Sequence, residues 1–221
     1  MENERIKAIY DAAVKLFLQQ GYSKTQISHI AGAVGVSVGT IYHDFAGKQE
    51  ILHFVLKCTI CPAYMTRDWE RPITDAPFHG LENEITQVFE KSAAEFSRHL
   101  EDGGKDYDFP TLISDAFDML SEYAVGCLFI EKNQFDFPHL AKNYRDYRKR
   151  FFQAMVDYLT LFMEKGSVRP LKNTRLTASM IIEILTWWAM DMRYISFEEN
   201  HVSPEEAKDI CMDNIIHAYG M

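Results

Sequence analysis

Residues 25–45 of the chain read TQISHIAGAVGVSVGTIYHDF, two short apolar patterns on either side of a glycine. In the first pattern Ile30 and Val34 lie at helical spacing, and Gly35 can end a helix in the left-handed conformation. In the second, Ser37 is placed to cap a helix that continues to the end of the string. The string predicts two short helices joined by a tight turn, the arrangement of a helix-turn-helix.

Outward from this string, helical periodicity continues along nearly the whole chain, and alternating strand patterns are scarce. A helix over about 4–20 precedes the string and ends at Gly21, and another follows Gly47 and should kink or end at Pro62. Further helices are expected over about 81–100, 110–132, 140–165 and 175–197, and from the Ser203 cap onwards. The patterns predict an all-α protein of about nine helices.

The composition is that of an ordinary folded protein. The chain has 221 residues, of which 47% are apolar and 25% charged, enough to bury a sizeable core. No apolar run reaches the ~20 residues of a membrane span, and the charged N-terminus lacks the pattern of a secretory signal. We therefore expect a cytoplasmic protein with no membrane partner.

Motifs of catalysis, cofactor binding and metal binding are absent from the sequence. It has no glycine-rich phosphate loop, nucleophile elbow or HExxH motif, so we expect no enzyme and no cofactor. Cys58 and Cys61 share one helix face, where a metal or a redox switch is conceivable. Since no second Cys/His pair stands nearby, inert thiols and no metal are the favoured interpretation.

The charge is unevenly distributed. The net charge is −9, yet residues 1–57 carry six Lys or Arg against five Asp or Glu, a net charge of +1, which leaves −10 on the rest. Phosphate binding needs local positive charge, so a nucleic-acid partner fits the first segment better than the second.

The spacings around the string closely resemble those of the tetracycline repressor (TetR) family of bacterial transcription factors. The resemblance covers roughly residues 6–55 and is carried by Ala12-Ala13, Leu16-Phe17, Gly21-Tyr22, Thr25, Ile30-Ala31, Val34-Gly35-Val36-Ser37, Gly39-Thr40-Ile41-Tyr42, Phe45, Lys48 and Leu52. It implies a helix-turn-helix DNA-binding domain over 1–47 and an effector-binding and dimerisation domain over 48–221.

The second helix of such a motif enters the major groove of DNA. The candidate DNA-contacting residues are Thr25, Ser37, Val38, Gly39, Thr40, Tyr42, His43 and Lys48. Val38 and Thr40 suit base edges, Gly39 lets the helix lie near the DNA backbone, and Lys48 at a helix start should bind phosphate. Thr25 and Ser37 are equally candidates for helix caps alone.

The resemblance also implies a small-molecule pocket between C-terminal helices and a homodimer through the last two helices. Most aromatic residues in this region must be plain core; the pocket candidates are Phe117, Tyr147, Phe151 and Trp187. The candidate interface residues are Leu185, Trp188, Cys211 and Ile215, and the alternative is a helix buried within one subunit.

Two functions from different classes follow. The first is a ligand-responsive regulator, a repressor that a small, largely hydrophobic effector releases from a pseudo-palindromic double-stranded operator. The second is an all-helical small-molecule binding or metabolic protein whose helix-turn-helix serves only for packing. Thr40, Tyr42 and Lys48 favour the first, since a packing unit has no need of a hydroxyl, a phenol and a cation on its exposed face.

Overall fold

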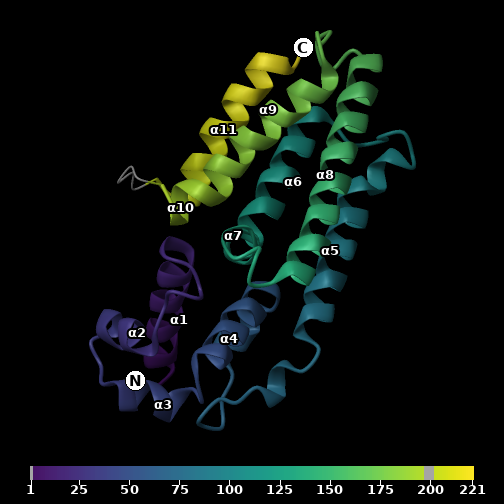
Figure 1. The fold of residues 1–221 in the computed structure, drawn as a ribbon. Coiled ribbons are helices and arrows are strands. Elements are labelled where there is room, and N and C mark those ends of the chain that lie inside the picture. The colour runs from purple at the N-terminus through teal and green to yellow at the C-terminus, as the bar shows by residue number, and fades with distance from the viewer. Residues whose placement is uncertain (1, 197–201) are drawn as a thin grey trace. The chain divides into compact units, whose positions relative to one another are not determined.

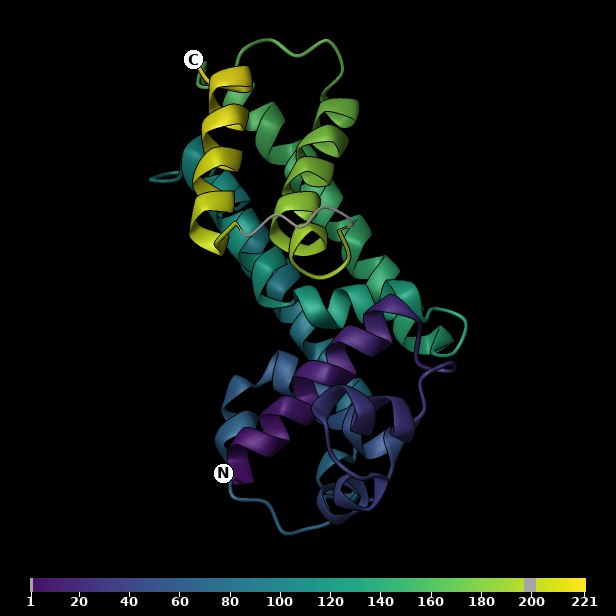
Figure 2. The same ribbon diagram turned by 90° about the vertical axis from the view of Figure 1, so that its left-hand side faces the viewer.

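The computed structural model describes residues 2–196 and 202–221, with side chains from Glu4 onwards, and this part of the chain is helical without a regular strand (Figures 1 and 2). The α-helices are α1 (Glu2–Gln19), α2 (Ile27–Val34), α3 (Val38–Asp44), α4 (Lys48–Ile60), α5 (Leu81–Ser97), α6 (Phe109–Glu122), α7 (Ala124–Lys132), α8 (Pro138–Glu164), α9 (Thr174–Thr186), α10 (Met192–Tyr194) and α11 (Pro204–Tyr219). The all-α prediction is confirmed, although the predicted end of a helix at Phe197 lies outside the described residues.

The chain divides into two compact units. Unit 1 comprises residues 1–86 and 125–141, and unit 2 comprises residues 87–124 and 142–221. The predicted functional boundary after residue 47 is a different division, because it separates the helix-turn-helix from everything that follows; it stays a prediction.

In unit 1, α1 packs on α2 and α4 around a core that includes Ile9, Phe17, Ile30, Ile41 and Phe45, each at most 1% exposed. These are the apolar positions of the helical patterns, so burial of one face of each helix accounts for the packing. In Figure 1, α1 to α4 lie together as one group of helices.

The helix boundaries in unit 1 follow from residues that the sequence displays. Gly35 has φ 77°, the left-handed conformation that ends α2, and the Ser37 hydroxyl accepts a hydrogen bond from the Thr40 backbone N–H at the start of α3. The helix after Gly47 ends at Ile60, directly before the Cys61-Pro62 pair, as the proline predicted.

One predicted helix is two. The pattern over 110–132 divides at Tyr123, which leaves helical geometry and separates α6 from α7. Gly126 in α7 then lies against α4, where an added Cβ would stand 3.0 Å from the Thr59 side chain. The periodicity alone predicted one helix, because the apolar spacing continues across the break at Tyr123. The break is accompanied by the close packing of α7 on α4.

Unit 2 is held by aromatic contacts between α5 and α8. The ring centroids of Phe96 and Phe151 are 4.6 Å apart, and those of Phe89 and Tyr147 are 5.1 Å apart. α6 and α11 pack on α9, which continues into a π-helical turn over Trp187–Asp191. The Ser203 cap of α11 is confirmed, with Glu206 completing a capping box.

None of the helices in the described parts of the chain is both long enough and apolar enough to cross a membrane.

A buried ion cluster holds the end of α3. Asp44 is fully buried, and its carboxylate accepts hydrogen bonds from Arg5 Nε (2.5 Å) and Nη2 (2.7 Å) and from Arg71 Nη1 (2.8 Å). Burial alone would raise the pKa of this carboxyl, but the bonds and charges from Arg5, His43 and Arg71 outweigh it and hold the pKa below its ordinary value. A buried carboxylate is tolerated when it is paired in this way.

We expect Asp44→Asn to lower the free energy of unfolding at pH 7 by about 3 kcal/mol, because two cations lose their anion. Since the folded-state pKa of Asp44 is depressed, its contribution is present above the unfolded pKa of about 3.9 and is lost as pH falls through the folded pKa. Urea unfolding of both proteins from pH 7 to pH 3 measures this. A stability difference that stays constant below pH 4 would contradict the assignment.

Candidate nucleic-acid interface

The outward face of α3 carries large side chains that do not contribute to the core. Val38 is 41% exposed and Tyr42 is 51% exposed, and the His43 side chain is exposed beside them. Leaving an apolar and an aromatic side chain in water gains nothing for folding, because their burial would be favourable. A face of this kind, on the second helix of a helix-turn-helix, is suited to contact with the edges of DNA bases.

The start of α3 is ordered by its own hydroxyls. Ser37 Oγ and Thr40 Oγ1 are 2.9 Å apart and share a hydrogen bond, while Ser37 also accepts from the Thr40 amide at 3.1 Å. Ser37 is therefore the N-terminal cap of α3, which is one of its two predicted roles; a DNA contact is the other and stays a prediction. The bond to Ser37 fixes the Thr40 side chain, so its hydroxyl and methyl group keep a defined orientation.

Gly39 lies on the exposed part of α3 without a conformational need for glycine. An added Cβ would meet Ser37 Oγ at 3.6 Å, which is ordinary contact, and the φ of Gly39 is not in the left-handed region. The protein itself thus tolerates alanine at this position. What glycine provides is space outside the helix.

Thr25 does not belong to the exposed surface. It is fully buried, and its hydroxyl donates to the Gly21 carbonyl at 2.8 Å. Neither is it the cap of α2, because Gln26 occupies that position. The prediction of a DNA contact at Thr25 is not compatible with this burial; the side chain instead closes the turn between α1 and α2.

Lys48 is the first residue of α4, as predicted, but its ammonium group turns toward the protein. The Nζ atom donates to the carbonyls of Tyr22 and Thr25, both at 2.9 Å, and lies 4.1 Å from the centre of the Tyr22 ring. These contacts tie α4 to the α1–α2 turn. An ammonium has three donors, so phosphate binding by Lys48 stays a prediction, in addition to this structural role.

The structure adds His29 to the candidate residues. His29 Nδ1 accepts from the Gln26 backbone N–H at 3.3 Å, which completes a capping box at the start of α2. Because a backbone N–H can only donate, Nδ1 is the unprotonated nitrogen and Nε2 carries the proton. His29 is exposed, so this N–H is an additional candidate donor to a phosphate.

The ion cluster of Asp44, Arg5 and Arg71 could not be predicted from the sequence pattern. A signal was present: Asp44 places a negative charge on the helix that should approach phosphates. The ion cluster explains it, because the carboxylate turns inward to the two arginines. Both cations are consequently committed to Asp44.

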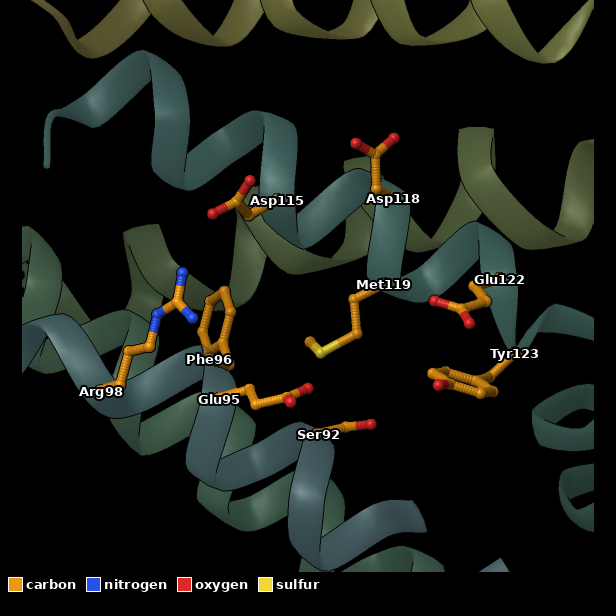
Figure 3. Close-up of a pocket in the computed structure, with 9 residues that line it drawn as sticks. All are labelled: Ser92, Glu95, Phe96, Arg98, Asp115, Asp118, Met119, Glu122 and Tyr123. Atoms are coloured by element: carbon orange, nitrogen blue, oxygen red, sulfur yellow. The ribbon is translucent and has the colours of Figure 1, made fainter. Parts of the chain in front are cut away.

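Unit 2 contains a polar groove between α5 and α6 (Figure 3). Its volume is about 360 Å³, and it is lined by Ser92, Glu95, Phe96, Arg98, Asp115, Asp118, Met119, Glu122 and Tyr123. Figure 3 shows Met119 and Phe96 between the two helices and the carboxylates around them. Asp115 accepts a bond from the Tyr107 hydroxyl, Asp118 pairs with Lys208 at 2.6 Å and Glu95 pairs with Lys91 at 3.7 Å, so these carboxylates are engaged within the protein.

A second groove, of about 330 Å³, lies between α5 and α8 and is lined in part by Arg150 and Asp157. None of the four predicted pocket residues lines either groove. Phe117, Tyr147 and Phe151 are at most 4% exposed and form core, whereas Trp187 is 41% exposed on the surface. The aromatic pattern thus identified core residues of unit 2, and an effector site among these four residues stays a prediction.

The predicted interface residues are also mostly core. Leu185, Cys211 and Ile215 are at most 1% exposed within the single chain, because they pack between α6, α9 and α11, and Trp188 is half-buried. The exposed apolar residues of these helices are instead Leu176 (64%), Met180 (58%), Trp187 (41%) and Ile210 (49%). Leu176, Met180 and Trp187 recur at helical spacing on α9 and its continuation. We call these three residues and Ile210 of α11 the α9/α11 stripe.

The cysteines show no sign of activation. Cys58 is buried, and burial together with the neighbouring Cys61 raises the pKa of its thiol to about 12. A thiol of that pKa is almost entirely protonated at neutral pH, so it is a weak nucleophile and a weak metal ligand.

Comparison with known proteins gives a match to the N-terminal module. Residues 9–55 match the family model described as "Bacterial regulatory proteins, tetR family". The HTH-type transcriptional regulator HbdR of Aromatoleum sp. (strain CIB) is 48% identical over 54 residues, 24% of each chain. The fatty acid metabolism regulator protein of Bacillus subtilis (strain 168) is 45% identical over 49 residues, 22% of this chain and 25% of the relative. The chain thus spans about a quarter of the length of these curated relatives.

The similarity in fold extends further. The ketosteroid transcriptional regulator KstR2 of Mycobacterium tuberculosis superposes with a TM-score of 0.54 at 17% identity, over 98% of this chain and 95% of that one. At this identity the likeness concerns the fold. The resemblance stated from the sequence is confirmed by these comparisons.

We expect Gly39→Ala to keep or raise the free energy of unfolding, by up to about 1 kcal/mol, because alanine suits a helix better than glycine and the protein has room for it. The added methyl group stands on the exposed face and should weaken DNA binding at least tenfold. Thermal unfolding and gel shift measure the two effects. Unchanged DNA affinity would remove Gly39 from the interface.

Proposed function

We propose that this chain, whose N-terminal module belongs to the tetR family of bacterial regulatory proteins, is a ligand-responsive transcriptional regulator that binds double-stranded operator DNA. The observation that carries the proposal is the exposed face of α3, with Val38, Tyr42 and His43 outward on a helix whose two ends are tied down. Rigid positioning of side chains that the core does not need is what direct reading of bases requires.

The proposed contacts divide into two kinds. Val38 and Thr40 meet base edges, where an apolar group and a methyl fit the C5-methyl of thymine and a hydroxyl serves as donor or acceptor. Tyr42, His43 and the N–H of His29 reach phosphates, which set affinity and register without reading sequence.

We further propose a homodimer formed through the α9/α11 stripe. Exposed apolar side chains that recur along one face of a helix favour an interaction surface, and in a two-fold dimer the same stripe meets itself. Two recognition helices about 34 Å apart would then read a pseudo-palindromic operator on one side of the duplex.

Regulation follows from linkage. A small, largely hydrophobic effector releases the operator when it binds more tightly to a conformation that does not fit DNA, and operator DNA weakens effector binding by the same factor. A dimer that occupies promoter DNA blocks transcription without catalysis, so repression is the proposed direction. The effector site that we propose lies in unit 2, in the aromatic region of Phe117, Tyr147 and Phe151.

The alternative is an all-helical small-molecule binding or metabolic protein in which the helix-turn-helix serves only for packing. In that protein, conservative changes on the outer face of α3 have no effect on any activity. The DNA experiment below distinguishes the two functions.

We expect the purified protein to enrich a pseudo-palindromic sequence from sheared genomic DNA. Thr40→Ala should change the base preference at one operator position. Tyr42→Phe should lower the affinity for operator DNA and for random DNA by about tenfold each, because one phosphate bond is lost. Tyr194→Phe in unit 2 is the matched control. If no sequence is enriched by the wild type, the regulator proposal fails.

We expect the wild type to be a dimer at micromolar concentration and Met180→Asp to be a monomer, because a carboxylate at a two-fold interface is desolvated twice. Phe135→Asp is the control, since Phe135 is 92% exposed on unit 1, outside the stripe. Sedimentation velocity measures both. A monomeric wild type, or a Met180→Asp dimer, would place the interface elsewhere.

A further inference from the structure

The segment between α4 and α5 returns to the recognition helix. Residues 61–80, here called the connector, contain two short 3₁₀ turns, Pro62–Thr66 and Ala76–Phe78. Helix–helix connections in compact domains usually take about 2–8 residues, and longer ones are commonly functional. The middle of the connector meets the residues that directly follow α3.

The first contact is through the backbone. The Ile73 N–H donates to the Asp44 carbonyl at 2.8 Å, and the Ala46 N–H donates to the Ile73 carbonyl at 2.9 Å, which makes a parallel bridge between Phe45 and Ile73. Ile73 is 1% exposed. The backbone that leaves α3 is therefore fixed by a pair of hydrogen bonds to the connector.

The second contact is ionic. Arg71 Nη1 donates to Asp44 Oδ1 at 2.8 Å, and the side chains of the two residues are 14% and 0% exposed. Arg5 of α1 holds the same carboxylate from another side. Asp44, the last residue of α3, thus joins α1, α3 and the connector.

The third contact is aromatic. Phe45, directly after α3, lies 5.4 Å from Phe54 of α4; Phe54 lies 5.7 Å from Trp69, and Trp69 lies 6.1 Å from Phe78, measured between ring centres. Two of these four rings belong to the connector. The connector is in turn tied to α4 by a short hydrogen bond between His53 and Asp75.

α3 has seven residues, and a helix of that length is not stable through its own hydrogen bonds. Its direction is set by what holds its ends. The Ser37 cap holds the start, and the connector holds the end.

We infer that Arg71 and Ile73 are positioning residues for the recognition helix, which makes the connector a second mechanical link to α3 besides α4. The inference rests on the proposed DNA-binding function. The chain runs from Ile73 through the second 3₁₀ turn directly into α5, so a displacement of the start of α5 reaches the end of α3 along the connector, which His53 and Asp75 also tie to α4. The connector sets the angle at which Val38 and Thr40 are presented to the groove.

The test compares Arg71→Gln with Arg67→Gln. Arg67 is the matched control because it lies in the same connector, where its guanidinium stacks on the rings of Tyr64 and Trp69. We expect Arg71→Gln to lower affinity for the selected operator about tenfold while affinity for random DNA changes less than twofold, since non-specific binding depends on phosphates and not on the angle of α3. A substitution that only destabilises the protein would lower the affinity for the operator and the affinity for random DNA by the same factor. Arg71→Lys, which keeps a cation near Asp44, should restore the ratio in part.

Hydrogen exchange of residues 38–46 provides a readout that does not need DNA. We expect these amides to exchange at least fivefold faster in Arg71→Gln than in wild type, with residues 9–17 of α1 unchanged. Unchanged exchange in α3, or equal losses for operator and random DNA, would overturn the inference. Absence of any DNA binding by the wild type would instead overturn the proposed function, and the exchange result would still decide whether the connector holds α3.

Discussion

The buried carboxylate of Asp44 is the interaction on which the N-terminal module depends. A charge in a protein interior is costly unless it is paired and hydrogen-bonded, and this one is paired with Arg5 and Arg71 at 2.5–2.8 Å. Because the three groups come from α1, α3 and the connector, satisfying the carboxylate brings these elements into one arrangement. The orientation of α3 thus depends on electrostatics inside the protein, together with the backbone and aromatic contacts at its end.

The same pairing determines the character of the reading surface. The arginines at Asp44 are committed, and the Lys48 ammonium donates to two backbone carbonyls. The outer face of α3 then presents Val38, Tyr42 and other uncharged or weakly charged groups. In the proposed function, recognition depends on the base contacts of this surface together with its phosphate contacts, and a two-fold dimer would double both.

The sequence predicted local structure well and tertiary environment poorly. Gly35, Ser37, Pro62 and Ser203 act through their own backbone geometry, so their helix boundaries could be predicted without knowledge of the fold. By contrast, whether an apolar residue such as Ile215 faces the core or a partner depends on which neighbouring helix covers it, and the pattern is identical in both cases. The aromatic residues of unit 2 pose the same ambiguity: Phe151 suits a pocket by chemistry but is core by packing. The inward orientation of the Asp44 side chain could not be predicted from the sequence, because it depends on Arg71, which is distant in sequence and lies beside the end of α3 in the fold.

In the proposed regulator, α3 of each subunit reads the major groove of one operator half-site, held there by its ends. Methylation of guanine N7, which lies in the major groove, tests it directly on the operator selected by the protein. We predict that methylation interferes with binding at two symmetric clusters whose centres are about 10 base pairs, or a multiple of one helical turn, apart. Binding that is indifferent to N7 methylation, or interference at a single cluster, would contradict it.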